Sequence, residues 1–176
     1  GRMLTGDFLH DVAPHTPAEG AAIAAAPTPD SALRVELQLA RTEADNARLM
    51  ERIMLPALNV RGIQGGGVAG QATNAVPVVA RASIDFRLVP RQQPARVREL
   101  VEAHARRQGF HVIHRDPTAE ERRAHPRLLK LQWEDGYPAS RADMSSTASR
   151  AVLRATEMGV GGQVIVVPTS GGSLPL

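Results

Sequence analysis

The feature that most constrains the fold is an alternating stretch bounded by Pro77 and Pro90. Even-numbered residues between the two prolines are apolar, whereas most odd-numbered residues are polar or charged. Successive side chains of a β-strand point to opposite faces, so the pattern predicts a strand with one covered and one open face. The covered face is predicted to hold Ala80, Ala82, Ile84, Phe86 and Leu88, and the open face Arg81, Ser83, Asp85 and Arg87. Such a strand suits an antiparallel sheet with helices on one side.

The neighbouring segments supply partners for this strand. Leu58 and Val60 alternate with polar residues, which predicts a second strand, and the glycines between 65 and 70 predict an irregular loop after it. The clearest helix is expected to begin at Gln93-Pro94 and to end at Gly109. One stripe of this helix is apolar and consists of Val97, Leu100, Val101 and Ala105. A further strand is expected over 110–113.

The N-terminal quarter is predicted to be helical. Thr16-Pro17 with Glu19 is typical of a helix start, and this helix is expected to end before Pro27. A second helix is expected to begin at Asp30 or Ser31, and a third to cover about 44–54.

The C-terminal third is predicted to contain a loop, two strands and a helix. The polar stretch 116–126 is expected to be a loop, and 128–133 a strand. A helix capped by Ser145 or Ser146 is expected over 147–158, and a short buried strand over 163–167.

Composition excludes several classes of protein. Of the 176 residues 43% are hydrophobic, which is enough to bury a core. The net charge is +3, but the arginines are interleaved with acids and only 3% of residues are aromatic, which disfavours nucleic-acid binding. No apolar run approaches the roughly 20 residues of a membrane helix, so no membrane partner is expected. The chain contains no cysteine, which excludes thiolate metal sites and is compatible with the cytoplasm, the expected compartment.

The order of the motifs resembles a known hydrolase family. A strand and a glycine loop precede Asn74-Ala-Val-Pro77, and a long strand then ends in Arg87-Leu-Val-Pro90, before a helix and a strand. This set resembles the lid, or dimerisation, domain of the zinc-dependent exopeptidases and deacylases. That family includes carnosinases, aminoacylases, acetylornithine deacetylase and succinyl-diaminopimelate desuccinylase. The stretch Ser170-Gly-Gly-Ser-Leu-Pro175 is more similar to the carnosinase-like dipeptidases than to the deacetylases.

The resemblance implies an α+β fold. Its main part would be a ferredoxin-like antiparallel sheet with helices on one face, an incomplete lid domain, joined to a short α/β piece of the catalytic domain. We expect residues 1–57 to be a helical connecting insert, 58–138 the lid domain, and 139–176 a truncated re-entry into the catalytic domain. The first strand and helix of the lid are expected upstream of this chain.

The resemblance also implies roles for two residues near the long strand. Arg87 would bind the substrate carboxylate, because a guanidinium group can hold a carboxylate with two parallel hydrogen bonds. Its residue type alone also allows a surface arginine paired with Asp85 or Glu99. Asn74 would stabilise an oxyanion in the active site of the partner subunit, and the alternative is an ordinary turn asparagine.

A glycine-rich segment near the end of the chain is the other candidate. The resemblance implies that Ser173, with Gly171 and Gly172, binds substrate, because exposed amides and a hydroxyl suit a carboxylate. An ordinary turn is the alternative.

No metal site is expected within the chain. The His-x-Asp motif, the adjacent Glu-Glu pair and the terminal histidine of the family are absent. His10, Asp11 and His15 lie in a proline-rich stretch without helical spacing. Zinc, or another divalent metal, is therefore expected only in the intact enzyme, bound by residues outside this sequence.

Three functions remain open at the level of sequence. The first is a fragment of a metal-dependent peptidase or amidohydrolase that cleaves a dipeptide or an N-acyl amino acid, with the isolated chain inactive. The second is a non-catalytic dimerisation module that forms a homodimer through the lid. The third, an RNA-binding ferredoxin-like module, is disfavoured because the open strand face carries no aromatic residue.

Overall fold

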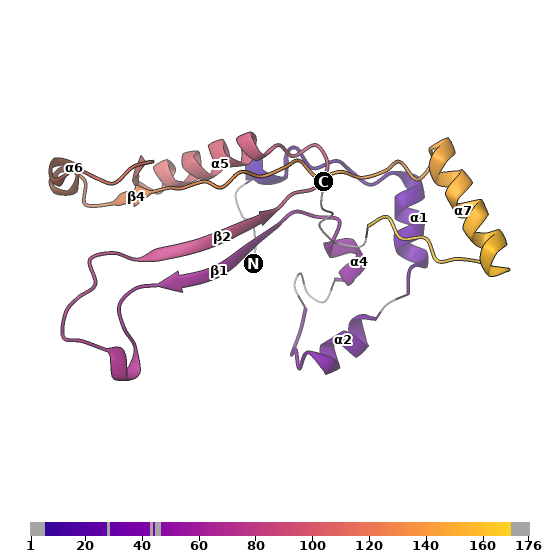
Figure 1. The fold of residues 1–176 in the computed structure, drawn as a ribbon, viewed down its shortest axis with the longest axis horizontal. Coiled ribbons are helices and arrows are strands. Elements are labelled where there is room, and N and C mark those ends of the chain that lie inside the picture. Colours follow the sequence, from indigo (N-terminus) through magenta and orange to yellow (C-terminus); the bar gives the residue numbers. More distant parts are fainter. Residues whose placement is uncertain (1–5, 28, 43, 45–46, 170–176) are drawn as a thin grey trace.

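The structure, a computed structural model, describes residues 6–27, 29–42, 44 and 47–169. Helices and two small sheets alternate along an elongated molecule (Figure 1). The α+β class is therefore confirmed.

The alternating stretch forms half of an antiparallel ribbon. Strand β1 (Ala57–Gln64) pairs with β2 (Arg81–Arg87), from Ala57 opposite Arg87 to Gln64 opposite Arg81. The register shifts between Val60 and Gly62, where one extra residue produces an irregularity. The connecting segment 65–80 includes the short helix η2 (Ala69–Gln71) and extends away from the rest of the molecule (Figure 1). The antiparallel pairing expected from the sequence is confirmed.

The apolar face of β2 is covered over only part of its length. Phe86 and Leu88 pack against the core, but Ala82 and Ile84 are exposed, which corrects the prediction of a fully covered face. The reason is that the described helices reach only the C-terminal end of the strand, so the outer half of the ribbon has no layer above it (Figure 1).

The main core lies where α5 (Pro94–Arg107) meets the end of β2. Val97 and Leu100 of α5 are buried together with Phe8 of the short helix η1 (Gly6–Leu9). The Phe8 and Phe86 rings are stacked with centroids 6.3 Å apart. The predicted helix is confirmed, and Gly109 follows it with a φ of +83°, as expected for a terminating glycine.

A second, parallel pair of strands lies beyond α5. Strand β3 (His111–Ile113) pairs with β4 (Leu128–Lys130), and the two are joined through α6 (Ala119–Ala124). The predicted loop over 116–126 is therefore wrong over α6. The missed signal was a capping box, in which Thr118 caps the helix and Glu121 bonds back to the Thr118 backbone.

The N-terminal helices are shorter than predicted, except the first. Helix α1 (Pro17–Ala25) begins with the expected cap, Thr16, and a capping box with Glu19. Helix α2 covers Asp30–Glu36, and α4 covers Leu49–Arg52 within the third predicted helix.

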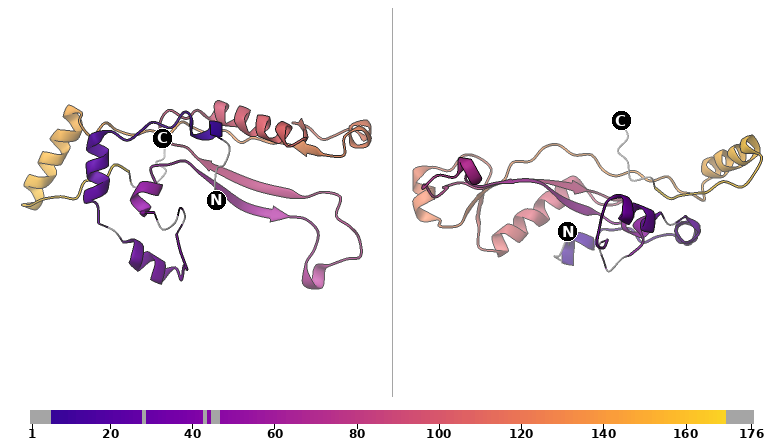
Figure 2. Two further views of the ribbon diagram at one scale, coloured as in Figure 1. Left: turned by 180° about the vertical axis from the view of Figure 1, so that it is seen from behind. Right: turned by 90° about the horizontal axis from the view of Figure 1, so that it is seen from below.

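A long extended segment follows β4 and leads to α7 (Thr147–Val160), which is capped by Ser146 as predicted. Helix α7 lies at the same end of the molecule as α1 but is separated from it in the view from below (Figure 2). The predicted strand over 163–167 is wrong, because no described strand lies beside it to pair with, and Ile165 is exposed. None of the described helices has the length and apolar character needed to cross a membrane.

Candidate functional site

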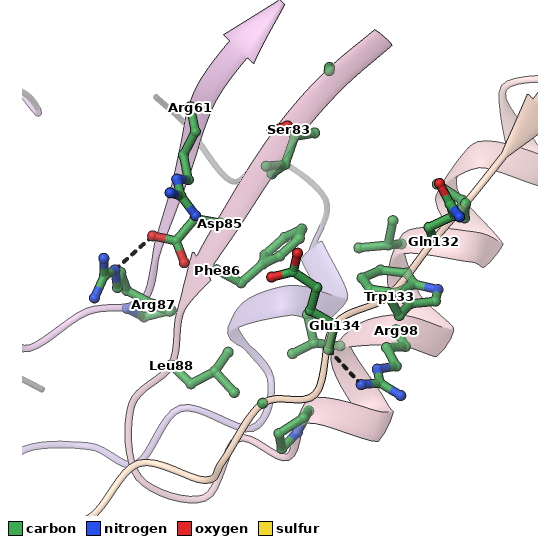
Figure 3. A pocket seen from close by; sticks show the side chains of 18 of the residues that line it. Arg61, Ser83, Asp85, Phe86, Arg87, Leu88, Arg98, Gln132, Trp133 and Glu134 are labelled. Atoms are coloured by element: carbon green, nitrogen blue, oxygen red, sulfur yellow. Dashed lines mark hydrogen bonds and ion pairs between the residues drawn. The ribbon is translucent and has the colours of Figure 1, made fainter. Parts of the chain in front are cut away.

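A large groove separates β2 from the segment that follows β4. Phe86 and Leu88 of β2 line one wall, Val97 and Val101 of α5 form part of the floor, and Trp133 lies on the opposite wall (Figure 3). The volume is about 2410 Å³, whereas small-molecule pockets are usually roughly 300–1,000 Å³. The groove is therefore an open space between β2 and the segment that follows β4. Individual side chains along it are the candidates for a binding site.

Arg87 ends strand β2 at the rim of this groove. Its side chain is 62% exposed, and its Nε donates a hydrogen bond to Oδ2 of Asp85 at 2.8 Å. Arg61 of β1 extends toward Asp85 from the neighbouring strand (Figure 3). Two guanidinium groups therefore lie near one carboxylate.

The opposite wall carries polar groups of its own. Arg98 of α5 donates from Nη2 to the backbone oxygen of Glu134 at 2.8 Å, and its guanidinium carbon lies 5.8 Å from the centroid of the Trp133 ring. Nε1 of Trp133 and Nδ1 of His104 are buried and have no hydrogen-bond partner within the described part of the chain. This wall can therefore form further hydrogen bonds with a group that enters the groove.

Asn74 lies far from Arg87. It is exposed in the segment that connects η2 to β2, at the outer end of the ribbon, whereas Arg87 lies at the inner end. The six steps from Arg81 to Arg87 alone span about 20 Å at the rise of a strand. The fold therefore does not bring the two predicted residues into one site within a single chain.

The other predicted substrate residues, Gly171, Gly172 and Ser173, lie outside the described residues, so their place relative to Arg87 stays a prediction.

The described residues do not fit a metal centre. A metal site needs several His, Asp or Glu donors that converge on one ion. No group of three or more such side chains lies close enough together in the part of the chain that the structure describes. Nδ1 of the His10 ring lies 3.2 Å from Oδ1 of its neighbour Asp11. The rings of His111 and His125 stack at 3.7 Å and are parallel within 1°, so the in-plane lone pairs of their nitrogens do not converge.

Three carboxyl groups have clearly lowered pKa values, and one of them, Asp116, lines the groove. Hydrogen bonds from Arg115 hold the pKa of Glu121 at about 2, and the Lys130 ammonium lowers the pKa of Asp116. The Ser145 hydroxyl and backbone likewise lower the pKa of Asp143. These are ion pairs and caps on the protein surface, and they indicate structural roles for the three carboxyl groups.

Two groove residues were not predicted as site residues from the sequence. Arg98 lies in the helix predicted between Gln93 and Gly109, and Trp133 lies at the end of the strand predicted over 128–133. Arg98 and Trp133 lie together because the extended segment after β4 passes beside α5. No local sequence motif predicts this path. Asp85 and Glu99 were the partners that the residue type of Arg87 allowed, and the structure contains the contact with Asp85. The role of Arg87 in substrate binding stays a prediction.

Comparison with known proteins gives a consistent result. The family model described as the peptidase dimerisation domain of M20 enzymes matches residues 21–112. The fold is similar to a metallo-carboxypeptidase of the M20 family, Sso-CP2 from Sulfolobus solfataricus. Sequence identity is 26%, the TM-score is 0.70, and the match covers 99% of this chain and 42% of that one. No curated protein matches the chain.

A second solved structure is similar in fold. It is the dipeptidase Dug1p from Saccharomyces cerevisiae, with 20% identity and a TM-score of 0.63, and the match covers 99% of this chain and 34% of Dug1p. The chain therefore spans less than half the length of either solved structure.

Proposed function

Because the chain belongs to the M20 peptidase family and contains its dimerisation domain, we propose that it is part of a metal-dependent peptidase or amidohydrolase. The proposed reaction is hydrolysis of the amide bond of a dipeptide or an N-acyl amino acid. Similarity to a metallo-carboxypeptidase over nearly the whole chain supports this class. The motif at 170–175 favours a substrate range like that of the carnosinases.

Arg87 is the proposed anchor for the substrate. Its place among the residues that line the groove, with a side chain that is 62% exposed, supports binding of the substrate carboxylate. Gly171, Gly172 and Ser173 are proposed to contact the same substrate. In this arrangement the chain holds and orients the substrate, and residues outside it hold the metal.

Asn74 is proposed to act in a second copy of the protein. Its distance from Arg87 along the ribbon supports a role across a dimer interface, where its amide would donate to the oxyanion. We therefore propose a homodimer that forms through the lid domain, 58–138. Residues 1–57 would be the connecting insert and 139–176 the return to the catalytic domain. The cysteine-free composition suits a reducing compartment, and we propose the cytoplasm.

The observation that carries the proposal is the exposed Arg87 at the end of β2, and its replacement tests it. In the full-length enzyme, Arg87→Ala should lower kcat/KM for substrates with a free carboxylate by about 10- to 100-fold, the value of a charged hydrogen-bonded contact. Bound metal, measured by elemental analysis, should not change.

Arg81→Ala is the matched control, because Arg81 is an exposed arginine at the other end of the same strand. It should leave turnover unchanged. Equal activity of the Arg87→Ala variant and the unmodified enzyme would remove Arg87 from the site.

The alternative is a non-catalytic dimerisation module. The exposed apolar side chains of the ribbon favour it for the isolated 176 residues, and so does the lack of a metal-donor cluster in the described part. Under both proposals the isolated chain has no hydrolytic activity when zinc is added.

A further inference from the structure

The groove runs along an edge of β2. Every residue from 78 to 90 lines it, and these residues include side chains from both faces of the strand. Because neighbouring side chains of a strand point to opposite faces, a groove above one face would be lined by alternate residues. Lining by consecutive residues therefore indicates that the groove passes beside the backbone of β2.

The other wall of the groove also contains a strand edge. Residues 128–142 line this wall without a break, and they comprise β4 and the extended segment that follows it. No residue of β3 lines the groove, so β3 pairs with the edge of β4 that lies farther from it. Among the described residues, β2 pairs with β1 alone and β4 with β3 alone. The groove therefore lies between two strand edges that have no partner in the described part of the chain, and such edges are templates for a further strand.

Helix α5 provides an apolar layer beneath the space between these edges. Val97, Val101 and Ala105 line the groove and are four residues apart, so they lie on one side of the helix. Phe86 and Leu88 of β2 pack against the cluster that contains Val97. An extended segment in the groove would therefore lie on the same helix that already covers the end of β2.

The size of the groove suits a polypeptide strand better than a small molecule. Its volume of about 2410 Å³ exceeds the roughly 300–1,000 Å³ of a small-molecule pocket. Strand β2 has seven residues, which span about 23 Å at the rise of a strand. A strand of similar length would hydrogen-bond to the free edge through its backbone and direct every second side chain toward α5.

We propose that the groove binds one further β-strand, which the intact protein supplies from outside these 176 residues and which joins the β1–β2 and β3–β4 pairs into one sheet. The strand alternates apolar residues, which contact α5, with polar ones. The inference rests on the proposed function in one respect, because it treats the chain as part of a larger enzyme. The match to Sso-CP2, which covers 99% of this chain but 42% of that one, supports a source within the same protein.

The proposal accounts for the uncovered part of β2. Ile84 is 49% exposed and Val79 is 46% exposed, and both residues line the groove. A strand paired with β2 would place its own side chains beside these residues on the same face of the sheet. The side chain of Ile84 should therefore be buried in the intact enzyme.

Photo-cross-linking in the full-length protein tests the proposal. p-Benzoylphenylalanine replaces Ile84 of β2 in one variant and Leu129 of β4 in another, because these residues line opposite sides of the groove. Both variants should form an adduct with the same segment of the same molecule, identified by mass spectrometry after digestion. This segment should lie outside residues 1–176 and should alternate apolar and polar residues.

Val152 is the matched control, because it is an exposed apolar residue on α7 that does not line the groove. The cross-linker at Val152 should not capture the segment that the two groove variants capture. Adducts confined to residues 1–176, adducts that join two copies, or different segments captured from the two sides would each overturn the proposal. Failure to capture any segment at both groove positions would also overturn it.

A smaller substitution gives an independent readout of the same burial. The 176 residues contain no cysteine, so Ile84→Cys and Val152→Cys each introduce one thiol into this part of the full-length protein. Ile84→Cys should react with iodoacetamide at least about tenfold more slowly than Val152→Cys, because a covered thiol is inaccessible to the reagent. Equal reaction rates at the two positions would contradict a strand in the groove.

The strand and the proposed function fail separately. If Arg87→Ala lowers kcat/KM but the groove variants capture no outside segment, then only the strand is wrong. If both groove variants capture the same outside segment but the full-length protein hydrolyses no amide bond, then the proposed function fails and the strand remains.

Discussion

Glu19 has a partner on each side of its carboxylate group. Its Oε2 accepts from the backbone N–H of Thr16 at 2.8 Å, which completes the cap of α1, and its Oε1 lies 2.9 Å from Nε of Arg141. The Glu19 side chain is 5% exposed and that of Arg141 is 14% exposed. The extended segment before α7 is therefore joined to α1 by a buried ion pair.

We expect the loss of one partner to be costly, because the remaining charge stays buried. Arg141→Met should lower the free energy of unfolding by about 3 kcal/mol, measured by urea denaturation. Glu19→Ala should cost at least as much, since it also removes the cap. The double variant should recover part of the loss, and a double variant that is less stable than both single variants would contradict this account.

The contacts of a single residue could be predicted from the sequence only where its partner lies a few residues away in the chain. Thr16 and Glu19 form a cap that four consecutive residues reveal, and Asp85 with Arg87 is a contact within one strand. Arg141 lies far along the chain from Glu19, and its approach depends on the path of the extended segment. The distance between Asn74 and Arg87 likewise follows from the length of the ribbon. The sequence motif that contains both residues does not predict this distance.

Helix α6 is a short element that its own side chains stabilise. Glu121 accepts from the backbone N–H of Thr118 at 2.8 Å, and Arg115 donates to both carboxylate oxygens at 2.7 and 2.8 Å. These hydrogen bonds, first those from Arg115, lower the pKa of Glu121 from 4.5 to about 2. The ionised form of Glu121 is therefore the one that the folded state prefers.

This preference predicts a loss of local stability in acid. Because the pKa in the folded state is below the unfolded value, the contribution of Glu121 is complete above about pH 4.5 and decreases as the pH falls toward about 2. Amide hydrogen exchange in α6 should therefore accelerate over this range relative to exchange in α5. In Glu121→Gln, α6 should exchange faster at neutral pH and lose this dependence. An unchanged pH profile in that variant would contradict the role of Glu121.

Elements with strong internal periodicity were predictable, and those that depend on neighbours were not. The alternation of β2, the apolar stripe of α5 and the cap of α7 are properties of their own residues. The segment 163–167 is equally apolar, but a strand also needs a partner edge, and no described strand provides one. Helix α6 was missed because its polar residues carry no periodic apolar signal, although its capping box was visible.

The whole molecule has little interior and much apolar surface. The main core consists of three buried side chains and their partly buried neighbours. The outer ribbon and its loop, by contrast, expose large apolar residues, which include Val60, Ile63, Val68, Val76 and Val78. Neither edge of the ribbon beyond the β1–β2 pairing has a strand partner among the described residues. Exposed edges and apolar patches of this kind favour association.

We therefore expect the 176-residue chain to self-associate through the ribbon, measured by sedimentation equilibrium. Ile63→Lys, at a residue that is 78% exposed on β1, should weaken the association by about tenfold or more, because a charge would be buried in an apolar contact. Val152→Lys, at an exposed position on α7, should have no effect and is the matched control. A strict monomer at millimolar concentration would contradict the proposal.

The contact of Gln92 with Phe8 has a consequence for synthesis. The buried Gln92 side chain donates to the backbone oxygen of Phe8 at 2.9 Å, across 84 residues of sequence. At translation rates of about 5–20 residues per second, Phe8 exists for about 4 to 17 seconds before Gln92 is made. For most of that time, until β2 is made, the aromatic ring has none of its final neighbours from β2 or α5. The segment around Phe8 is thus a candidate client for chaperones at the ribosome.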